Sequence, residues 1–310
     1  MDIARKYGRF KTTFILKLFL FYSKLPFHYQ IPRKTIFKIK NLNIGFLVEI
    51  FNWMCYNICE DAFSEFRRAF LRATTHRGGN MNYVISDPHG RYDLYKKMLE
   101  RIGFSDGDTL YILGDFVDRS QGGLKILLDI SNRDNVIGII GNHDYIASNV
   151  LSSLSRQLRP GQLEDMYELI MAWKMDGGMD TLDEYRALST EDRKLSLMML
   201  DSLRNYAEVS VGGREFVLCH AGIANYVEGK PLYEYNTIDF IVEREDYSKP
   251  KFAKKGKYLV TGHTPTVAIE GAVSGKIYRN HDHIAIDCGA VFDYGLSCLC
   301  LDTMEEFYVK

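Results

Sequence analysis

The sequence predicts an α/β fold, and three observations lead to that class. From Met81 onward, short apolar runs alternate with segments of helical periodicity in the order β-α-β-α-β. Helical spacing then covers residues 145–206, and runs of strand length dominate the rest of the chain. With 310 residues, of which 46% are hydrophobic and 25% charged, the chain can bury a large core and is neither disordered nor collagen-like in composition.

The individual elements follow from the same patterns. Three strands, at 82–86, 109–113 and 136–140, are separated by helices at 92–102 and 123–130. The helical insertion is interrupted at Pro160-Gly161 and Gly177-Gly178, because these residue pairs break helices. The later strands are expected at 214–219, 257–261, 284–287, 296–301 and 305–309. We therefore expect two packed β-sheets flanked by helices, with a helical insertion at one end.

Residues 1–80 differ in composition from the rest of the chain. They hold 14 Lys or Arg and 5 Asp or Glu, a net charge of +9 within a chain whose total is −1. One hypothesis is that they are upstream sequence translated only conceptually, since Arg77 to Asn80 can be encoded by a purine-rich stretch resembling a bacterial ribosome-binding site. The alternative is a helical extension, apolar over 44–71, that contacts a partner or a membrane surface. Either way, we expect the catalytic domain to span 81–310.

Composition also restricts the class of protein. The net charge of −1 argues against nucleic-acid binding through bulk charge. The apolar run at 14–22 is interrupted by Lys17 and is far shorter than the roughly 20 residues that span a bilayer. Six scattered cysteines do not form a secreted disulfide framework, and Cys298 and Cys300 fit one buried strand face. We expect a cytoplasmic protein without a transmembrane segment.

Five polar clusters each follow a predicted strand, where ligands of open α/β sheets collect. The clusters are Ser86-Asp87-Pro88-His89-Gly90, Gly114-Asp115-Phe116-Val117-Asp118-Arg119, Gly141-Asn142-His143-Asp144, His220-Ala221-Gly222 and Gly262-His263-Thr264-Pro265. In an extended chain residues i and i+2 face the same way, so Asp87 and His89 can reach one metal, and Pro88 suits that backbone.

Singly, each cluster is typical of structural or solvated residues, but together they predict a metal centre. Four of the eight histidines, two carboxylates and one Asn form a mixed nitrogen and oxygen set, which favours Mn²⁺, Fe or Zn²⁺ over Ca²⁺. Outside this set, His281 and His283 are interpreted as surface residues of a polar turn. Asp287 either lines the site or closes a structural turn.

In this order the clusters resemble the signature of the phosphoprotein phosphatase family within the binuclear metallophosphoesterases, especially its bacterial and phage-lambda-phosphatase-like branch. The resemblance covers residues 81–310 and implies a calcineurin-like, four-layer αββα sandwich with the site at the strand ends. It implies two divalent metal ions, with Mn²⁺ expected. Their ligands would be Asp87 and His89 for the first metal, Asp115 for both, and Asn142, His220 and His263 for the second.

The resemblance also implies the catalytic and substrate-binding residues. His143 would be the general acid, oriented by Asp118, while Arg119 and Asn142 would contact the phosphate. The segment Ile241-Val242-Glu243-Arg244-Glu245 resembles the family's Trp-x-Arg-Glu, with Val242 in place of Trp, so Arg244 would be a second phosphate-binding Arg. A hydroxide bridging two cations would attack phosphorus, the arginines would donate to its oxygens, and His143 would protonate the leaving alkoxide.

Four residues depart from the family pattern without removing a ligand: Ser86, Pro88, Ser120 and Asp144. We expect Ser120, in place of a Gly, to strain its loop most. Residues 173–181 resemble a segment of bacterial relatives and are expected to form part of the substrate wall.

The expected substrate is phosphoserine or phosphothreonine in proteins, or a small phosphoester. The alternative is a symmetrical diadenosine-tetraphosphate hydrolase, whose family shares most of these clusters. Those hydrolases have a small residue where this chain has Asp118, and a different continuation after the last Gly-His than Thr264-Pro265. Two further alternatives are a catalytically silent binding module and a regulator held on a membrane through residues 1–80.

Overall fold

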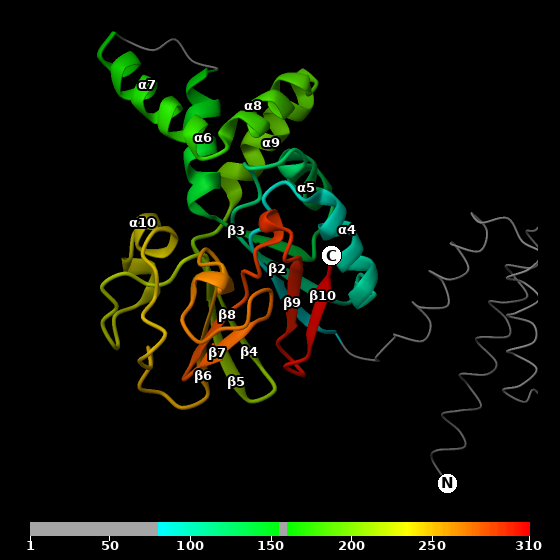
Figure 1. Ribbon diagram of the computed structural model, residues 1–310, viewed down its shortest axis with the longest axis vertical. Coiled ribbons are helices and arrows are strands. Elements are labelled where there is room, and N and C mark those ends of the chain that lie inside the picture. The colour runs from blue at the N-terminus through cyan, green and yellow to red at the C-terminus, as the bar shows by residue number, and fades with distance from the viewer. Residues whose placement is uncertain (1–79, 155–159) are drawn as a thin grey trace, which may run out of the picture. The chain divides into compact units, whose positions relative to one another are not determined.

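Two five-stranded β-sheets carry the fold in the computed structural model, which describes residues 80–154 and 160–310 (Figure 1). The first has the order β10-β9-β1-β2-β3 and the second β4-β5-β6-β8-β7. The strands are β1 (Asn82–Ile85), β2 (Thr109–Leu113), β3 (Val136–Ile139), β4 (Tyr206–Val211), β5 (Arg214–Cys219), β6 (Lys257–Thr261), β7 (Tyr278–Asn280), β8 (His283–Ala285), β9 (Leu296–Cys300) and β10 (Glu306–Val309). The predictions for residues 1–79 lie outside the described residues.

Seven α-helices accompany the sheets in the part of the chain that the structure describes. They are α4 (Tyr92–Ile102), α5 (Gly123–Ile130), α6 (Asn142–Leu154), α7 (Pro160–Met175), α8 (Gly178–Ala187), α9 (Thr190–Ser202) and α10 (Thr237–Ile241). Helices α6 to α9 form the predicted insertion and project from one end of the sheets (Figure 1). The two predicted interruptions are present, since α7 begins at Pro160 and Gly177 separates α7 from α8.

The alternation of side chains along the strands builds four layers. In β1, Ile85 packs in the cluster that contains α4 and α5, whereas its neighbour Val84 belongs to the cluster between the sheets. In β5, Phe216 shares that central cluster, and Val217 packs on the opposite face with Phe240 of α10. The order of layers is therefore helix, sheet, sheet, helix, and the predicted αββα sandwich is confirmed.

The topology brings strand ends to one edge. Strands β1, β2 and β3 are parallel neighbours in the first sheet, and β5, β6 and β8 are parallel neighbours in the second. Because parallel strands end at the same edge of a sheet, the loops after each set of three strands emerge together, and a contact between Asp115 after β2 and His220 after β5 shows that the two sets of loops meet.

His283 is buried in β8, where its Nε2 lies 2.9 Å from the carbonyl oxygen of Lys249, so its interpretation as a surface residue was wrong, whereas His281 is exposed. Cys298 and Cys300 are buried and unpaired, as predicted. Among the described residues, no helix has the length and hydropathy needed to cross a membrane.

Candidate metal and catalytic centre

The loops at the carboxyl ends of the parallel strands surround a cavity of about 360 Å³. It is lined by Asp115, Arg119, Asn142, His143, Asp176, Arg244, His263, Pro265 and Phe292. Six of these nine residues were predicted as site residues. The remaining predicted residues, Asp87, His89, Asp118 and His220, are all buried against this cavity wall through contacts described below.

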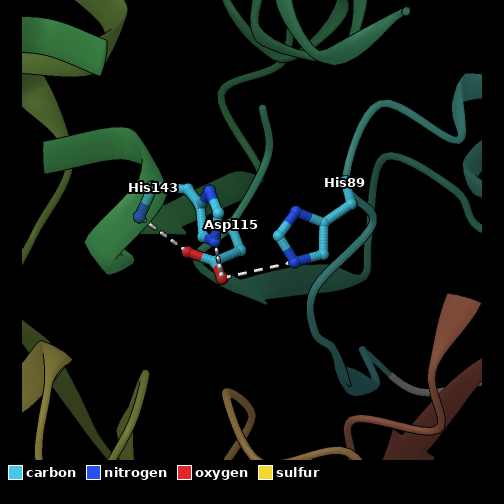
Figure 2. Close-up of side chains that lie close together, drawn as sticks. All are labelled: His89, Asp115 and His143. Carbon is cyan, nitrogen blue, oxygen red and sulfur yellow. Dashed lines mark hydrogen bonds and ion pairs between the residues drawn. The ribbon is translucent and has the colours of Figure 1, made fainter. Parts of the chain in front are cut away.

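Asp115 lies at the centre of the cluster. Its Oδ2 is 3.4 Å from Nε2 of His89, and its Oδ1 is 3.4 Å from Nε2 of His220. Figure 2 shows the carboxylate between His89 and His143, with the backbone N–H of His143 donating to Oδ1 at 3.1 Å. One carboxylate oxygen therefore faces each group of imidazoles, which is the arrangement that a bridging ligand requires.

His89 presents an unprotonated nitrogen to Asp115. Its Nδ1 lies 3.0 Å from the carbonyl oxygen of Val117, which can only accept, so the proton is on Nδ1 and the lone pair on Nε2. Burial lowers the pKa of His89 to about 4, so the ring is neutral at pH 7. Arg119 Nη1 lies 3.1 Å from the same Nε2.

A second group of acceptor atoms gathers around His220. Its Nδ1 donates to the carbonyl oxygen of Leu113 at 2.7 Å, which leaves the lone pair on Nε2. That Nε2 lies 2.9 Å from Asn142 Oδ1 and 3.2 Å from His263 Nδ1. Burial and the neighbouring His220 lower the pKa of His263 to about 4, which favours its neutral form. A cation would satisfy these converging lone pairs together.

Buried carboxylates give the same indication of cation binding. Asp87 and Asp287 are both buried, and the Asp87 carboxylate accepts the backbone N–H of His263 at 3.1 Å. Burial and the charges of Asp287 and Asp115 raise the pKa of Asp87 well above its usual range. Burial, with the charge of Asp115, also raises the pKa of Asp287 to about 7. The donor set thus fits divalent cations, which would neutralise this concentration of negative charge.

The backbone is left-handed at four of the predicted ligands. The φ angles are 51° at Asp87, 41° at His89, 53° at Asp115 and 62° at His263. The prediction that Asp87 and His89 converge because the chain is extended was therefore wrong. Tight turns, which cost conformational energy in non-glycine residues, aim these side chains at the cavity.

His143 has a different environment from the three other histidines. Its Nδ1 is 2.8 Å from Oδ2 of Asp118, whose side chain is completely buried. Burial lowers the pKa of His143, but the Asp118 hydrogen bond and the charge of Asp115 outweigh it, so the pKa is raised. His143 also lies near Asp115 and His89, yet its raised pKa suits it to carry a proton. The pKa values of His89, His220 and His263 are lowered, which suits these neutral rings to bind metal.

The insertion holds Asp118 in place. Trp173 Nε1 donates to Asp118 Oδ2 at 2.8 Å, and the hydroxyl of Thr181 donates to Oδ1 at 2.6 Å. The same hydroxyl accepts the backbone N–H of Asp118 at 2.8 Å. These two members of the predicted substrate wall thus bind the partner of His143.

Asp176, which lies between Trp173 and Thr181 in the sequence, faces the cavity and was not predicted individually. Its Oδ1 is 3.0 Å from Nη2 of Arg119, and its Oδ2 is 3.4 Å from Nε2 of His143. Arg119 Nη2 is itself 2.9 Å from His143 Nε2. In the sequence, Asp176 is marked only by its position just before Gly177-Gly178. Nothing in the sequence pattern indicates that its side chain reaches Arg119.

A family model described as calcineurin-like phosphoesterase matches residues 83–293. The chain belongs to this family. The match covers both sheets except β9 and β10 and the first residue of β1, and it includes every predicted site residue.

Individual relatives of this phosphoesterase match shorter stretches. A symmetrical bis(5'-nucleosyl)-tetraphosphatase of Cronobacter sakazakii is 40% identical over 76 residues, which are 24% of this chain and 27% of that protein. The protein of the same name from Escherichia coli K12 is 35% identical over 88 residues, 28% of this chain and 31% of its own. The matched stretches thus span less than a third of these relatives. The crystal structure of a candidate diadenosine tetraphosphatase has a TM-score of 0.51 at 16% identity, covers 75% of this chain and 94% of its own, and supports the fold alone.

Two departures from the family pattern have clear surroundings in this phosphoesterase. Asp144 is buried and accepts the backbone N–H groups of Asp115, Phe116 and Gly141 at 2.8 to 2.9 Å, so it supports the loop that carries Asp115. Ser120 does not have a positive φ, and its hydroxyl donates to the carbonyl oxygen of His89. The strain expected at Ser120 was wrongly placed, because it falls on Asp118 and Arg119, with φ of 70° and 67°.

Arg244 follows α10 and is exposed at the rim of the same cavity. Its charge contributes to the lowered pKa of His263. Val242, which replaces the family's Trp, is 52% exposed, so no core position is left unfilled by this change.

Proposed function

We propose that this phosphoesterase hydrolyses phosphomonoesters, with phosphoserine and phosphothreonine in proteins as its substrates, and that it belongs to the phosphoprotein phosphatase branch. The observation that carries the proposal is the buried Asp118 to His143 hydrogen bond of 2.8 Å beside the two groups of ligand atoms. A proton donor so placed serves an alkoxide leaving group, which needs a proton as it departs.

Six residues would hold the cations: Asp87, His89, Asp115, Asn142, His220 and His263. When bound, two divalent cations supply an activated water and neutralise charge on the phosphoryl oxygens. We propose Mn²⁺ as the native ion, because the mixed nitrogen and oxygen set suits it. All six residues fall within 81–310, the span we propose for the catalytic domain.

The chain's own groups then bind the phosphoryl group and move the proton. Arg119 and Arg244 donate to phosphoryl oxygens. As the oxygen of water bonds to phosphorus, the bond from phosphorus to the ester oxygen breaks and its electron pair stays on that oxygen. His143 transfers its Nε2 proton to this oxygen, and Asp118 keeps the ring in position and stabilises its charged form. The products are an alcohol and inorganic phosphate.

A second candidate function is symmetrical hydrolysis of diadenosine tetraphosphate. It is favoured by the names of the two bacterial relatives, which are 35% to 40% identical over their matched stretches. Asp118 argues for the first candidate, since those hydrolases are expected to have a small residue there.

The experiment compares substrates directly. The full chain is stripped of metal, supplied with Mn²⁺, and assayed for phosphate release from phosphoserine and phosphothreonine peptides and for cleavage of diadenosine tetraphosphate. Metal-dependent peptide dephosphorylation that His143→Asn removes is the expected result. Preferred cleavage of the dinucleotide would support the second candidate, and inactivity on both substrates would contradict both functions.

A further inference from the structure

Asp176 lies between the two groups that the proposed reaction uses on substrate. One carboxylate oxygen is 3.0 Å from Arg119 Nη2, and the other is 3.4 Å from His143 Nε2. The side chain is 54% exposed, so it can move toward solvent when a phosphoryl group approaches Arg119. Its contact with His143 places it on the side where the proposed function expects the leaving group.

The backbone at the junction of α7 and α8 fixes this carboxylate next to Arg119. The carbonyl oxygen of Gly177 accepts the backbone N–H of Arg119 at 3.1 Å. Gly177 has a φ of +97°, and a Cβ there would lie 2.8 Å from Arg119 Cγ. Glycine is therefore required for so close an approach, and the backbone of Asp176, one residue earlier, is held near the cavity while its side chain can still move.

We propose that Asp176 is a specificity-determining residue that disfavours leaving groups carrying negative charge beside the scissile bond. The inference rests on the proposed function. Serine and threonine leave as neutral alcohols once protonated, and the N–H groups of a peptide can donate to the carboxylate. A nucleoside diphosphate instead brings its own negative charge to the same wall, so Asp176 selects against dinucleoside polyphosphates.

The magnitude follows from the interaction of two like charges. At a separation of roughly 6 Å, repulsion in a medium of dielectric constant between about 20 and 80 corresponds to a change of roughly 3- to 100-fold in selectivity. Because Asp176 is half-exposed, we expect a value of about tenfold, decreasing with added salt.

The test uses Asp176→Asn in the full chain, which removes the charge and keeps the shape. The ratio of kcat/KM for diadenosine tetraphosphate to that for a phosphothreonine peptide should rise about tenfold. The control is Asp183→Asn, the same change on an exposed carboxylate of α8 whose neighbour is Arg186 at 3.5 Å, and it should leave the ratio unchanged. Melting temperatures of both variants check that they fold.

A binding measurement makes the two failures distinguishable. Calorimetric titration should show that Asp176→Asn binds ADP more tightly than the unmodified chain, by about the same factor. If the unmodified chain hydrolyses neither substrate, the proposed function fails while ADP affinity still tests Asp176. If neither the ratio nor the ADP affinity changes, or if Asp183→Asn changes them equally, the inference is overturned.

Discussion

The hydroxyl of Thr181 should be essential both to stability and to catalysis, although Thr181 lies outside the cavity. In this buried side chain the hydroxyl donates to the Asp118 carboxylate at 2.6 Å and accepts the Asp118 backbone N–H at 2.8 Å. Thr181→Val removes both interactions and keeps nearly the same volume. It leaves Asp118, whose only other described side-chain partners are His143 and Trp173, less firmly held.

The expected loss can be estimated from these two bonds. A hydrogen bond to a charged group contributes about 1.5–3 kcal/mol, and an unsatisfied buried N–H costs about 1–3 kcal/mol. Since the structure relaxes in part, we expect the free energy of unfolding to fall by about 3 kcal/mol. For a domain of this size that corresponds to a melting temperature lower by roughly 6–12 °C. A displaced Asp118 misorients His143, so kcat should fall roughly 10- to 100-fold.

Thermal unfolding followed by circular dichroism and steady-state kinetics with a phosphothreonine peptide measure the two effects. Thr181→Ser is the matched control because it keeps the hydroxyl, and loss of its methyl group should cost about 1 kcal/mol. The serine variant should therefore retain most of the activity. The reasoning is refuted if the valine variant melts and turns over like the unmodified chain, or if serine and valine reduce kcat equally.

Three other changes test separate parts of the centre. His143→Asn should lower kcat at least 100-fold and change the melting temperature little, because Asn cannot transfer a proton to the leaving oxygen. A large drop in melting temperature together with the drop in kcat would indicate a structural role instead. Removing metal with a chelator should lower the melting temperature, and Mn²⁺ should restore it. At a Mn²⁺ concentration a hundredfold above Kd, the free energy of unfolding should rise by about 2.7 kcal/mol. An unchanged melting curve would contradict the ligand assignment. Glu184→Gln should lower the free energy of unfolding by about 1 kcal/mol, because the buried Glu184 carboxylate accepts three backbone N–H groups at the start of α5. Thermal unfolding measures this loss, and an unaltered melting temperature would mean that the charge of Glu184 does not stabilise the helix.

The sequence was most informative where local pattern and tertiary structure agree. The apolar runs of β1, β2 and β5 are buried on both faces, so they read as strands without further information. The strands that were missed lie at sheet edges. In β4, exposed Glu208 and Ser210 alternate with buried Ala207 and Val209, and in β7 the sequence Tyr-Arg-Asn has no apolar pattern at all. Such segments form strands because a neighbour provides hydrogen-bond partners, which a single-sequence pattern does not record.

In the candidate site, too, some features could be predicted from local sequence and others depend on tertiary contacts. Ligand types at strand ends were predictable because parallel strands finish at one edge. The left-handed turns at Asp87 and His89 were not, since tertiary contacts impose that conformation against local preference. Asp176 is 57 residues from Arg119 in the sequence, and their contact depends on how α7 and α8 meet. Asp287 was left open for a similar reason, because the charge it adds to Asp87 appears only when β8 and β1 end together.

The predicted metal ligands and the residues around the proposed substrate site lie on different parts of the fold, which suggests how substrate preference can change without loss of the metal centre. The predicted metal ligands follow the strands and begin α6, whereas Trp173, Asp176 and Thr181 belong to the helical insertion. Two of these insertion residues hold Asp118, the partner of His143, and the third places a carboxylate 3.4 Å from His143 Nε2. Because the proposed acid His143 and the proposed charge selection by Asp176 both depend on the junction of α7 and α8, a changed junction should alter substrate preference and kcat together, while the predicted metal ligands stay in place.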